Sequence, residues 1–295
     1  FDTETDALSS PSENLCGVSL AVAPGEAVYL PVGHEEESNS AGGLAFEVAA
    51  DLGQLTHDVV IARLKPLLED PKVLKVAQNA KYDIAVLARH GIQVAPIDDT
   101  MLISYVLETG LHGHGMDELS KLWLGHEPIS FKTVAGTGKA QKSFKHIPLE
   151  PATCYAAEDA DVTLRLWKKL KPRLAREGML TVYETLERRL PPVLAAMENH
   201  GVRIDPEALR LLSNDFGLRM AEFEAKAHAV AGRPFNLGSP KQIGDILFGE
   251  LALPGGKKTA TGAYGTDASI LDDLAAQGHE LPRILLEWRQ LSKLR

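Results

Sequence analysis

The chain has 295 residues, a net charge of −9 and a hydrophobic content of 44%, a composition typical of one large or two ordinary globular domains. It contains no apolar run of the ~18 residues that a bilayer span requires and no signal peptide. The two cysteines, Cys16 and Cys154, are too few for a disulfide framework and suit a reducing compartment. These features exclude a membrane or disulfide-stabilised protein, and we expect a cytoplasmic monomer.

Most of the excess negative charge lies in the first 180 residues. A protein that binds nucleic acid only by neutralising phosphates should be basic. An enzyme that holds cations on carboxylates can be acidic, because the metal ions supply the positive charge. A solvated acidic surface explains most of these residues equally well, so the charge alone excludes neither class of protein.

Strand and helix patterns alternate through the first part of the chain. An opening strand is followed by two short strands within 15–32, which meet at the turn Pro24-Gly25, and by a polar loop at 33–43. The other predicted elements are helices at 58–68, 81–89, 100–107, 116–124 and 151–176, a strand at 73–77 and a loop at 134–143. This order predicts an α/β domain.

The pattern becomes almost entirely helical after residue 178. Helices are predicted at 180–199, 206–231, 240–250 and 281–291, with a Gly/Lys/Thr loop at 255–266. We therefore predict two domains, at 1–178 and 179–295. Because the chain begins with Phe and its last predicted helix has no Gly or Asn cap, we expect a truncated part of a longer protein.

Carboxylates stand at positions where they could work together. Asp2 and Glu4 are two apart in the opening strand, so both side chains leave one face, although a polar strand end also explains the pair. Asp83 lies at a strand-to-helix junction, where an acid at a helix start is the ordinary explanation. Tyr155 and Asp159 are four apart and share one face of the long helix, and Asp159 lies beyond the turns that the helix dipole favours.

The types of residue point to a hard cation. No Cys or His pattern suits zinc, and His112 and His114 are expected in a loop. Oxygen ligands favour Mg²⁺ or Mn²⁺, and two such ions ~4 Å apart can promote displacement at a phosphorus atom. The run 136–140 is not a phosphate-binding loop, because Thr133 and Ala140 stand where that motif needs Gly and Ser or Thr.

Three runs resemble the motifs of the DEDD exonucleases, in the branch with Tyr in the third motif: 2–6, 78–83 and 155–161. Their order and spacing are similar to those of the proofreading domain of bacterial DNA polymerase I, a family A polymerase. The runs 197–205 and 235–242 resemble the start of its polymerase region, the thumb. The resemblance implies a ribonuclease H-like exonuclease domain, with a mixed sheet flanked by helices, followed by a mainly α-helical thumb segment.

The resemblance also implies a role for each matching residue. Asp2, Glu4 and Asp159 would hold a first Mg²⁺ or Mn²⁺ ion, Asp2 would bridge to a second ion, and Asp83 would bind that ion through water. Tyr155 would orient the attacking water. The residues implied to contact DNA are Thr3, Leu8, Gln78, Asn79, Lys81 and Phe131. Lys257 and Lys258 lie in a thumb loop that could touch duplex phosphates, although a solvated basic loop explains them as well.

Leu8 and Phe131 match apolar positions that separate the last bases of a strand in this family. Ordinary packing in the core is the alternative explanation for both residues. The family often has Arg shortly before Met116, whereas this chain has Gly113-His114-Gly115, so a phosphate contact from that loop is not implied.

We therefore predict a two-metal 3′→5′ exonuclease that hydrolyses the terminal phosphodiester of single-stranded or frayed DNA, as the proofreading part of a DNA polymerase I in replication and repair. Palm and fingers motifs are absent, so no polymerisation is expected. One alternative is an RNA-trimming exonuclease similar to ribonuclease D, which the thumb-like sequence disfavours. Another is a catalytically idle DNA-binding scaffold of the polymerase.

Overall fold

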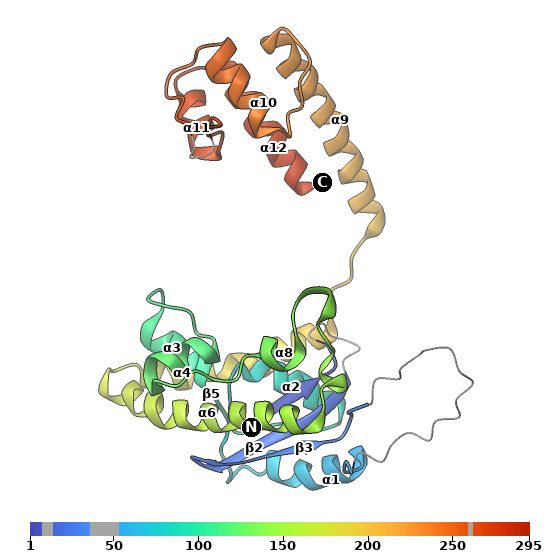
Figure 1. Cartoon of the computed structure of the whole chain (residues 1–295), viewed down its shortest axis with the longest axis vertical. Coiled ribbons are helices and arrows are strands. Elements are labelled where there is room, and N and C mark those ends of the chain that lie inside the picture. Colours follow the sequence, from blue (N-terminus) through green and yellow to red (C-terminus); the bar gives the residue numbers. More distant parts are fainter. Residues whose placement is uncertain (8–13, 36–52, 259–261) are drawn as a thin grey trace, which may run out of the picture. The chain divides into compact units, whose positions relative to one another are not determined.

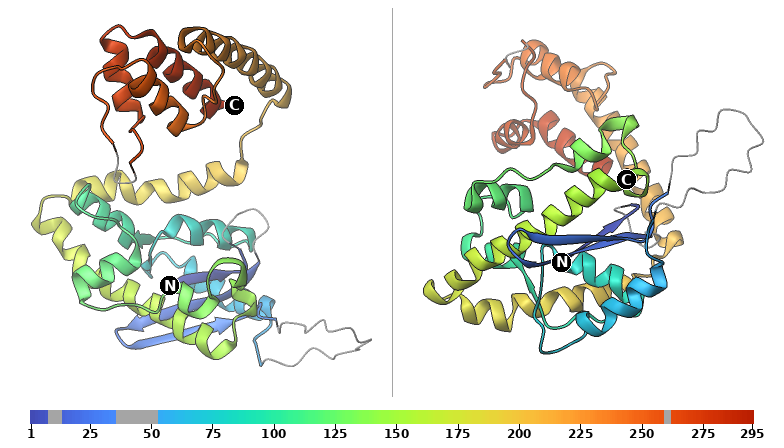
Figure 2. Two further views of the ribbon diagram at one scale, coloured as in Figure 1. Left: turned by 45° about the horizontal axis from the view of Figure 1, so that its top comes forward. Right: turned by 60° about the horizontal axis from the view of Figure 1, so that its bottom comes forward.

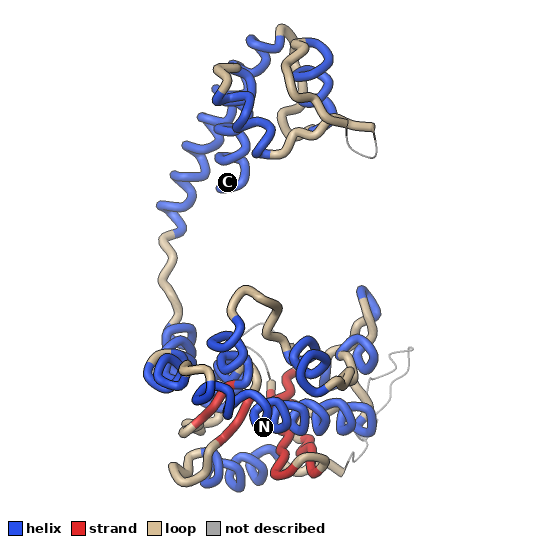
Figure 3. The backbone as a smooth tube through the Cα atoms, turned by 90° about the vertical axis from the view of Figure 1, so that its left-hand side faces the viewer, coloured by secondary structure: helices blue, strands red, loops and turns tan. Residues whose placement is uncertain are grey.

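The computed structural model describes residues 1–7, 14–35, 53–258 and 262–295. The chain divides into two compact units, Phe1–Val202 (unit 1) and Arg203–Arg295 (unit 2). Unit 1 contains strands and helices, whereas Figure 3 draws unit 2 as helices and loops. The predicted order of an α/β domain followed by a mainly helical segment is confirmed. Leu8 lies outside the described residues.

Two small sheets form the centre of unit 1. β1 (Asp2–Thr5), β2 (Leu15–Ala23) and β3 (Glu26–Pro31) make an antiparallel sheet in that order. β4 (Lys75–Ala77) pairs in parallel with β5 (Ile97–Asp99). The meander predicted at 15–32 is confirmed, but β5 was not predicted, because two of its three residues are aspartates.

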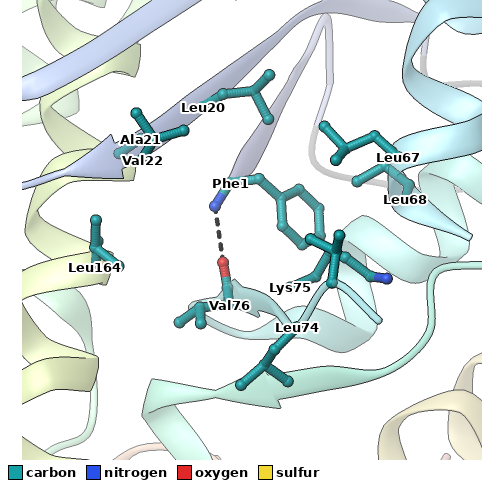
Figure 4. Close-up of a pocket in the computed structure, with 11 residues that line it drawn as sticks. Phe1, Leu20, Ala21, Val22, Leu67, Leu68, Leu74, Lys75, Val76 and Leu164 are labelled. Carbon is teal, nitrogen blue, oxygen red and sulfur yellow. Dashed lines mark hydrogen bonds between the residues drawn. The ribbon is translucent and has the colours of Figure 1, made fainter. Parts of the chain in front are cut away.

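Phe1 connects the two sheets. Its backbone nitrogen donates a hydrogen bond to the Val76 carbonyl oxygen in β4, at 2.7 Å (Figure 4). Its ring belongs to the main core of unit 1, together with Leu68. The pocket drawn in Figure 4 lies beside this connection and is lined mainly by apolar side chains of β2, β4 and the segment 67–74.

The helices of unit 1 flank the antiparallel sheet on both faces. They are α1 (His57–Leu68), α2 (Ala80–Arg89), α3 (Thr100–Glu108), α4 (Met116–Leu124), α5 (Phe131–Ala135), α6 (Leu149–Arg176), α7 (Leu180–Thr185) and α8 (Leu190–His200), with the 3₁₀ turns η1 (Gly138–Ala140), η2 (Phe144–His146) and η3 (Glu187–Arg189). α6 crosses one face and α1 covers the other (Figures 1 and 2). Ala152, Ala156 and Ala160 recur every fourth residue along α6 and are fully buried, so the helix can approach the strands closely.

Unit 1 continues beyond residue 178, the end predicted for the first domain. Tyr183 of α7 is fully buried, and its hydroxyl donates to Asp98 of β5 at 3.1 Å. The Asp98 carboxylate also forms ion pairs with Lys171 at 3.1 Å and with Arg188 of η3 at 2.9 Å. These contacts join α7 and η3 to β5. The single helix predicted at 180–199 is therefore wrong: it is three segments, and Pro191 at the start of α8 has no N–H for a helical hydrogen bond to residue 187.

Unit 2 consists of α9 (Pro206–Ala231), α10 (Pro240–Gly244), the π-helical turn η4 (Asp245–Glu250), α11 (Ala268–Ala276) and α12 (Glu280–Leu294). α9 is capped by Asp205, whose carboxylate accepts hydrogen bonds from the backbone nitrogens of Glu207 and Ala208, both at 3.0 Å. The helices predicted at 206–231 and 281–291 are confirmed, whereas α11 was not predicted. Across the described parts of both units, every helix is too short or too polar to cross a membrane.

Candidate metal centre

β1 presents Asp2 and Glu4 on the face of the sheet that α6 covers. Glu4 lies opposite Gly17 of β2, and the ring of Tyr29 occupies the space beside this glycine. A Cβ atom on Gly17 would lie 2.3 Å from that ring, so only glycine fits there. Glu4 is buried and Asp2 is partly exposed. The alternation predicted from the spacing of the two acids therefore holds.

α6 brings the third carboxylate to this pair. Asp159 is buried, and one of its oxygens, one of Asp2 and one of Glu4 all lie within 4.8 Å of one another. Among the described residues this is the one group of three or more His, Cys, Asp or Glu side chains close enough to share a metal ion. The three residues come from β1 and α6, which pack directly against each other, and this gives the group a rigid support.

Asp83 reaches the centre from the first turn of α2. It is 1% exposed, and its Oδ1 atom accepts hydrogen bonds from the backbone nitrogen of Thr3 at 2.9 Å and from the Thr3 hydroxyl at 2.7 Å. The start of α2 is fixed by Asp99, whose carboxylate accepts from the backbone nitrogen of Ala80 at 2.8 Å. Asp99 also caps α3 through the nitrogen of Met101 at 2.8 Å. The capping role of Asp99 was not predicted, although an aspartate directly before a helix is a recognisable capping residue.

The crowding of carboxylates disfavours their ionised forms. Burial raises the pKa of Asp2 to about 6. Burial, followed by the charge of Asp2, raises the pKa of Asp159 to about 8. The pKa values of Glu4 and Asp83 are also raised well above their usual range, first by burial and then by the neighbouring acids. A bound cation would reverse this effect, because opposite charge favours the ionised form.

The unsatisfied atoms of the group match an oxygen-liganded cation. Glu4 Oε1 and Asp159 Oδ1 are buried and have no hydrogen-bond partner in the described part of the chain. Buried carboxylate oxygens without a partner are costly, and a hard cation such as Mg²⁺ or Mn²⁺ would satisfy them. The residues present therefore fit a divalent metal ion.

Tyr155 stands one helical turn before Asp159 and borders an open pocket. Its ring centroid lies 6.1 Å from that of Phe131 and 5.9 Å from that of Phe144. Burial, and then the Asp159 charge, raises the pKa of the Tyr155 hydroxyl above its usual value, so this group stays protonated and can donate a hydrogen bond. The pocket is lined by residues 3–7, 141–144, Tyr82, Phe131 and Tyr155.

The residues expected to contact DNA from the second motif differ in their surroundings. Gln78 uses its amide inside the fold, donating to the His114 carbonyl oxygen at 2.8 Å. Lys81 pairs with Glu198 of α8 at 2.5 Å. Asn79 has an exposed side chain and a left-handed backbone, with φ of 60°. A left-handed residue that is not glycine is strained and is common at functional turns.

The other expected contacts are spread over both units. Thr3 is 5% exposed and directs its hydroxyl to Asp83, not to the surface. Phe131 is half-buried at the pocket wall. In unit 2, Lys257 and Lys258 are exposed, and Lys258 Nζ lies 5.3 Å from the centre of the Tyr264 ring.

Two acids beside Asp159 contact neighbouring segments. Glu158 and Asp161 are both half-buried. Glu158 accepts hydrogen bonds from the Ile129 nitrogen at 2.5 Å and from His126 at 2.9 Å. Asp161 accepts from the Gly25 nitrogen at 2.7 Å, in the turn between β2 and β3. Both acids therefore anchor neighbouring segments to α6.

The pocket contains residues that the sequence patterns did not identify. The Tyr82 hydroxyl hydrogen bonds with the Thr5 hydroxyl at the end of β1. The Ser143 hydroxyl donates to the Asp6 carbonyl oxygen at 2.6 Å. Phe144 stacks on Phe131, with centroids 6.4 Å apart and planes inclined by 15°. Ser143 and Phe144 lie in or directly after a predicted loop without periodic patterning, so only the fold shows that they lie beside β1.

Comparisons with known proteins agree along the chain. A family model described as 3′-5′ exonuclease matches residues 1–175, and one described as DNA polymerase family A matches residues 206–295. DNA polymerase I of Rhizobium leguminosarum is 51% identical over 304 residues, covering 100% of this chain and 30% of that protein. DNA polymerase I of Pseudomonas aeruginosa is 45% identical, covering 100% of this chain and 31% of that protein. The chain thus spans under a third of these relatives.

A solved structure is similar in fold. It is the POL domain of Pol1 from M. smegmatis in complex with DNA primer-template and dNTP. The match has a TM-score of 0.68 and 26% sequence identity, and it covers 95% of this chain and 42% of that chain.

Proposed function

Because the chain belongs to the 3′-5′ exonuclease family, we propose that unit 1 hydrolyses the terminal 3′ phosphodiester of single-stranded or frayed DNA in a metal-dependent reaction. The observation that carries this proposal is the set of Asp2, Glu4 and Asp159 oxygens within 4.8 Å of one another. Glu4 and Asp159 each contribute a buried oxygen without a hydrogen-bond partner among the described residues. Of these acids, Glu4 lines the open pocket at Tyr155, in which a strand end could lie.

Asp2, Glu4 and Asp159 would hold a first Mg²⁺ or Mn²⁺ ion, and Asp2 and Asp83 would serve a second. Bound together, such ions activate water and neutralise charge on the scissile phosphate. The Tyr155 hydroxyl, which stays protonated, would orient the attacking water by accepting a hydrogen bond from it. This role requires no change in the protonation of Tyr155, in keeping with its raised pKa.

The aromatic wall of the pocket suits the last bases of a single strand. The rings of Phe131 and Phe144 are stacked on each other, and the ring of Phe131 lies next to that of Tyr155. Stacking on an aromatic side chain contributes about 1–3 kcal/mol per base and tolerates any base. We propose that Phe131 supports the terminal bases while Asn79 contacts the backbone of the strand.

Two lysine sites could add to DNA binding at modest cost. Lys81 is paired with Glu198, and an exposed ion pair of this kind contributes about 0–1 kcal/mol, so a phosphate can displace the acid. Lys257 and Lys258 are exposed and could contact duplex phosphates. We expect the whole polypeptide to act in DNA replication and repair as a DNA polymerase I, with no polymerisation by these 295 residues alone.

An RNA-trimming activity is the second candidate, because the same carboxylates would serve it. The match of residues 206–295 to DNA polymerase family A favours DNA. A catalytically idle DNA-binding scaffold is the third candidate, and the complete set of four buried or partly buried acids disfavours it.

The test uses a DNA oligonucleotide labelled at its 5′ end and an RNA oligonucleotide of the same sequence. We expect a ladder of DNA products shortened from the 3′ end, dependent on Mg²⁺ or Mn²⁺ and absent with EDTA. Asp159→Asn should lower the rate by about 10³-fold or more, because metal-bound charge contributes several kcal/mol to the transition state. Glu150→Gln, which removes an exposed acid of α6, is the matched control. Equal cleavage by Asp159→Asn, or a preference for RNA, would overturn the proposal.

A further inference from the structure

Thr3 stands between the two acids of β1 but faces away from them. It is 5% exposed, and its hydroxyl donates a hydrogen bond to Asp83. The backbone nitrogen of Thr3 donates to the same oxygen, Asp83 Oδ1. Two donors of one residue thus hold one oxygen of a carboxylate that is itself 1% exposed.

The position of this contact follows from the end of a strand. β1 pairs with β2 along one edge. Along its other edge, Phe1 donates to Val76 of β4 at 2.7 Å, and β4 ends at Ala77. The next backbone nitrogen on this edge of β1 belongs to Thr3. It donates to the Asp83 carboxylate at 2.9 Å and not to a carbonyl oxygen of a neighbouring strand. Asp83 therefore completes the hydrogen bonding of β1 where β4 stops.

We propose that Thr3 is a positioning residue, which fixes Asp83 Oδ1 through its hydroxyl and backbone nitrogen so that Oδ2 faces the cation site beside Asp2. This inference rests on the proposed function. A carboxylate with both oxygens free could rotate about its terminal torsion, which is broad. Fixing one oxygen removes that freedom, as do the outer contacts that orient metal ligands in general.

A simple packing role for Thr3 makes a different prediction. Valine has nearly the shape of threonine but no hydroxyl, so Thr3→Val would be tolerated if only volume mattered. If the hydroxyl positions Asp83, Thr3→Val weakens the site while Thr3→Ser retains it. Thr163→Val is the matched control, because Thr163 is likewise buried, with 1% exposed, but its hydroxyl donates only weakly, to Met116 Sδ at 3.7 Å.

The experiment measures Mn²⁺ binding to the 295-residue chain in the presence of an oligonucleotide with an uncleavable phosphorothioate 3′ linkage. We expect Thr3→Val to weaken Mn²⁺ binding by about 10–100-fold, the usual effect of removing an outer contact of a metal ligand. Thr3→Ser and Thr163→Val should bind within about 3-fold of the wild type. Thermal unfolding of each variant shows whether it is folded.

A double substitution separates positioning from general damage. In an Asp83→Ala background, Thr3→Val should have no further effect on Mn²⁺ binding, because its target is gone. Wild-type binding by Thr3→Val, an equal defect in Thr3→Ser, or full additivity with Asp83→Ala would each overturn the inference. If the wild type binds Mn²⁺ but cleaves no DNA, the proposed function fails, and the role of Thr3 at the cation site is still decided by these variants.

Discussion

Unit 1 contains buried aspartates in β5 and at the metal centre, and their charges have different surroundings in the two places. Asp98 of β5 is fully buried and is surrounded by donors: Lys171, Arg188, the Tyr183 hydroxyl and the Trp167 indole nitrogen, the last at 2.8 Å. At the metal centre, no Lys or Arg of the described chain forms an ion pair with Asp2, Glu4 or Asp159, and two carboxylate oxygens have no hydrogen-bond partner there.

This difference separates a structural acid from a ligand. A buried charge must be paired or it is costly. The protein supplies the pairing cations to Asp98, and that pairing joins α7 and η3 to unit 1. Among the described residues no Lys or Arg pairs with the acids of the metal centre, which therefore gains from a cation that comes from solution.

The largest expected effect on stability is at the paired acid. Asp98→Asn should lower the free energy of unfolding by about 3–5 kcal/mol, because it leaves Lys171 and Arg188 without their buried partner. Urea denaturation followed by the fluorescence of Trp167 would measure it. As a control, Glu127→Gln breaks the exposed pair with Lys121 and should change stability by at most about 1 kcal/mol. A small effect at Asp98 would contradict the distinction.

Metal ions should stabilise the protein by binding to the acids of the metal centre, Asp2, Glu4 and Asp159. At a concentration 100 times the dissociation constant, Mn²⁺ should add about 2.7 kcal/mol to the free energy of unfolding. Thermal unfolding with and without Mn²⁺ measures this gain. The gain should disappear in Asp159→Asn and persist in Asp98→Asn, provided the latter is folded. An equal gain in Asp159→Asn would mean that the cation binds elsewhere.

Without metal, the two acids should respond to neutralisation in opposite directions. Asp159→Asn removes a carboxyl group that must be buried beside Asp2, either ionised or after it has taken up a proton on folding, so we expect it to stabilise the metal-free protein by about 1 kcal/mol. Urea denaturation in EDTA measures the change at neutral pH. A loss of stability similar to that of Asp98→Asn would show that Asp159 has a structural partner.

His34 is a buried titratable group that, unlike the ion-paired Asp98, remains neutral. Its Nδ1 atom donates to the Ile147 carbonyl oxygen at 3.1 Å, so Nε2 accepts from the Tyr29 hydroxyl at 2.8 Å. Burial lowers the pKa of His34 below its usual value. The unfolded chain therefore binds the proton of this histidine first as the pH falls, and the contribution of His34 to stability should decrease below about pH 6.5.

This pH effect should be the smallest of the four. Urea denaturation of the wild type and of His34→Gln at pH 7 and pH 5 would measure it: the stability of the wild type relative to that of the variant should be lower at pH 5 than at pH 7. His200→Gln, at an exposed position, should leave the difference unchanged. An unaltered pH dependence in His34→Gln would assign it to other groups.

Local spacing was enough to predict which candidate ligands lie side by side within one element. Side chains alternate along a strand, so Asp2 and Glu4 had to share a face, and residues four apart on a helix had to place Tyr155 beside Asp159. The α/β order and the long helix α6 were predictable for the same reason, since periodic burial is recorded in consecutive residues.

Contacts between distant segments were decided only by the tertiary structure. No local pattern pairs Thr3 with Asp83, or Asp98 with Arg188, because the partners are 80 and 90 residues apart. β5 and the three segments of 180–200 were missed for this reason: their stability comes from buried partners, not from local periodicity. The sequence by itself determined which carboxylates are candidate ligands of a cation, and the fold decided that Asp98 is the buried aspartate that pairs with Lys171 and Arg188.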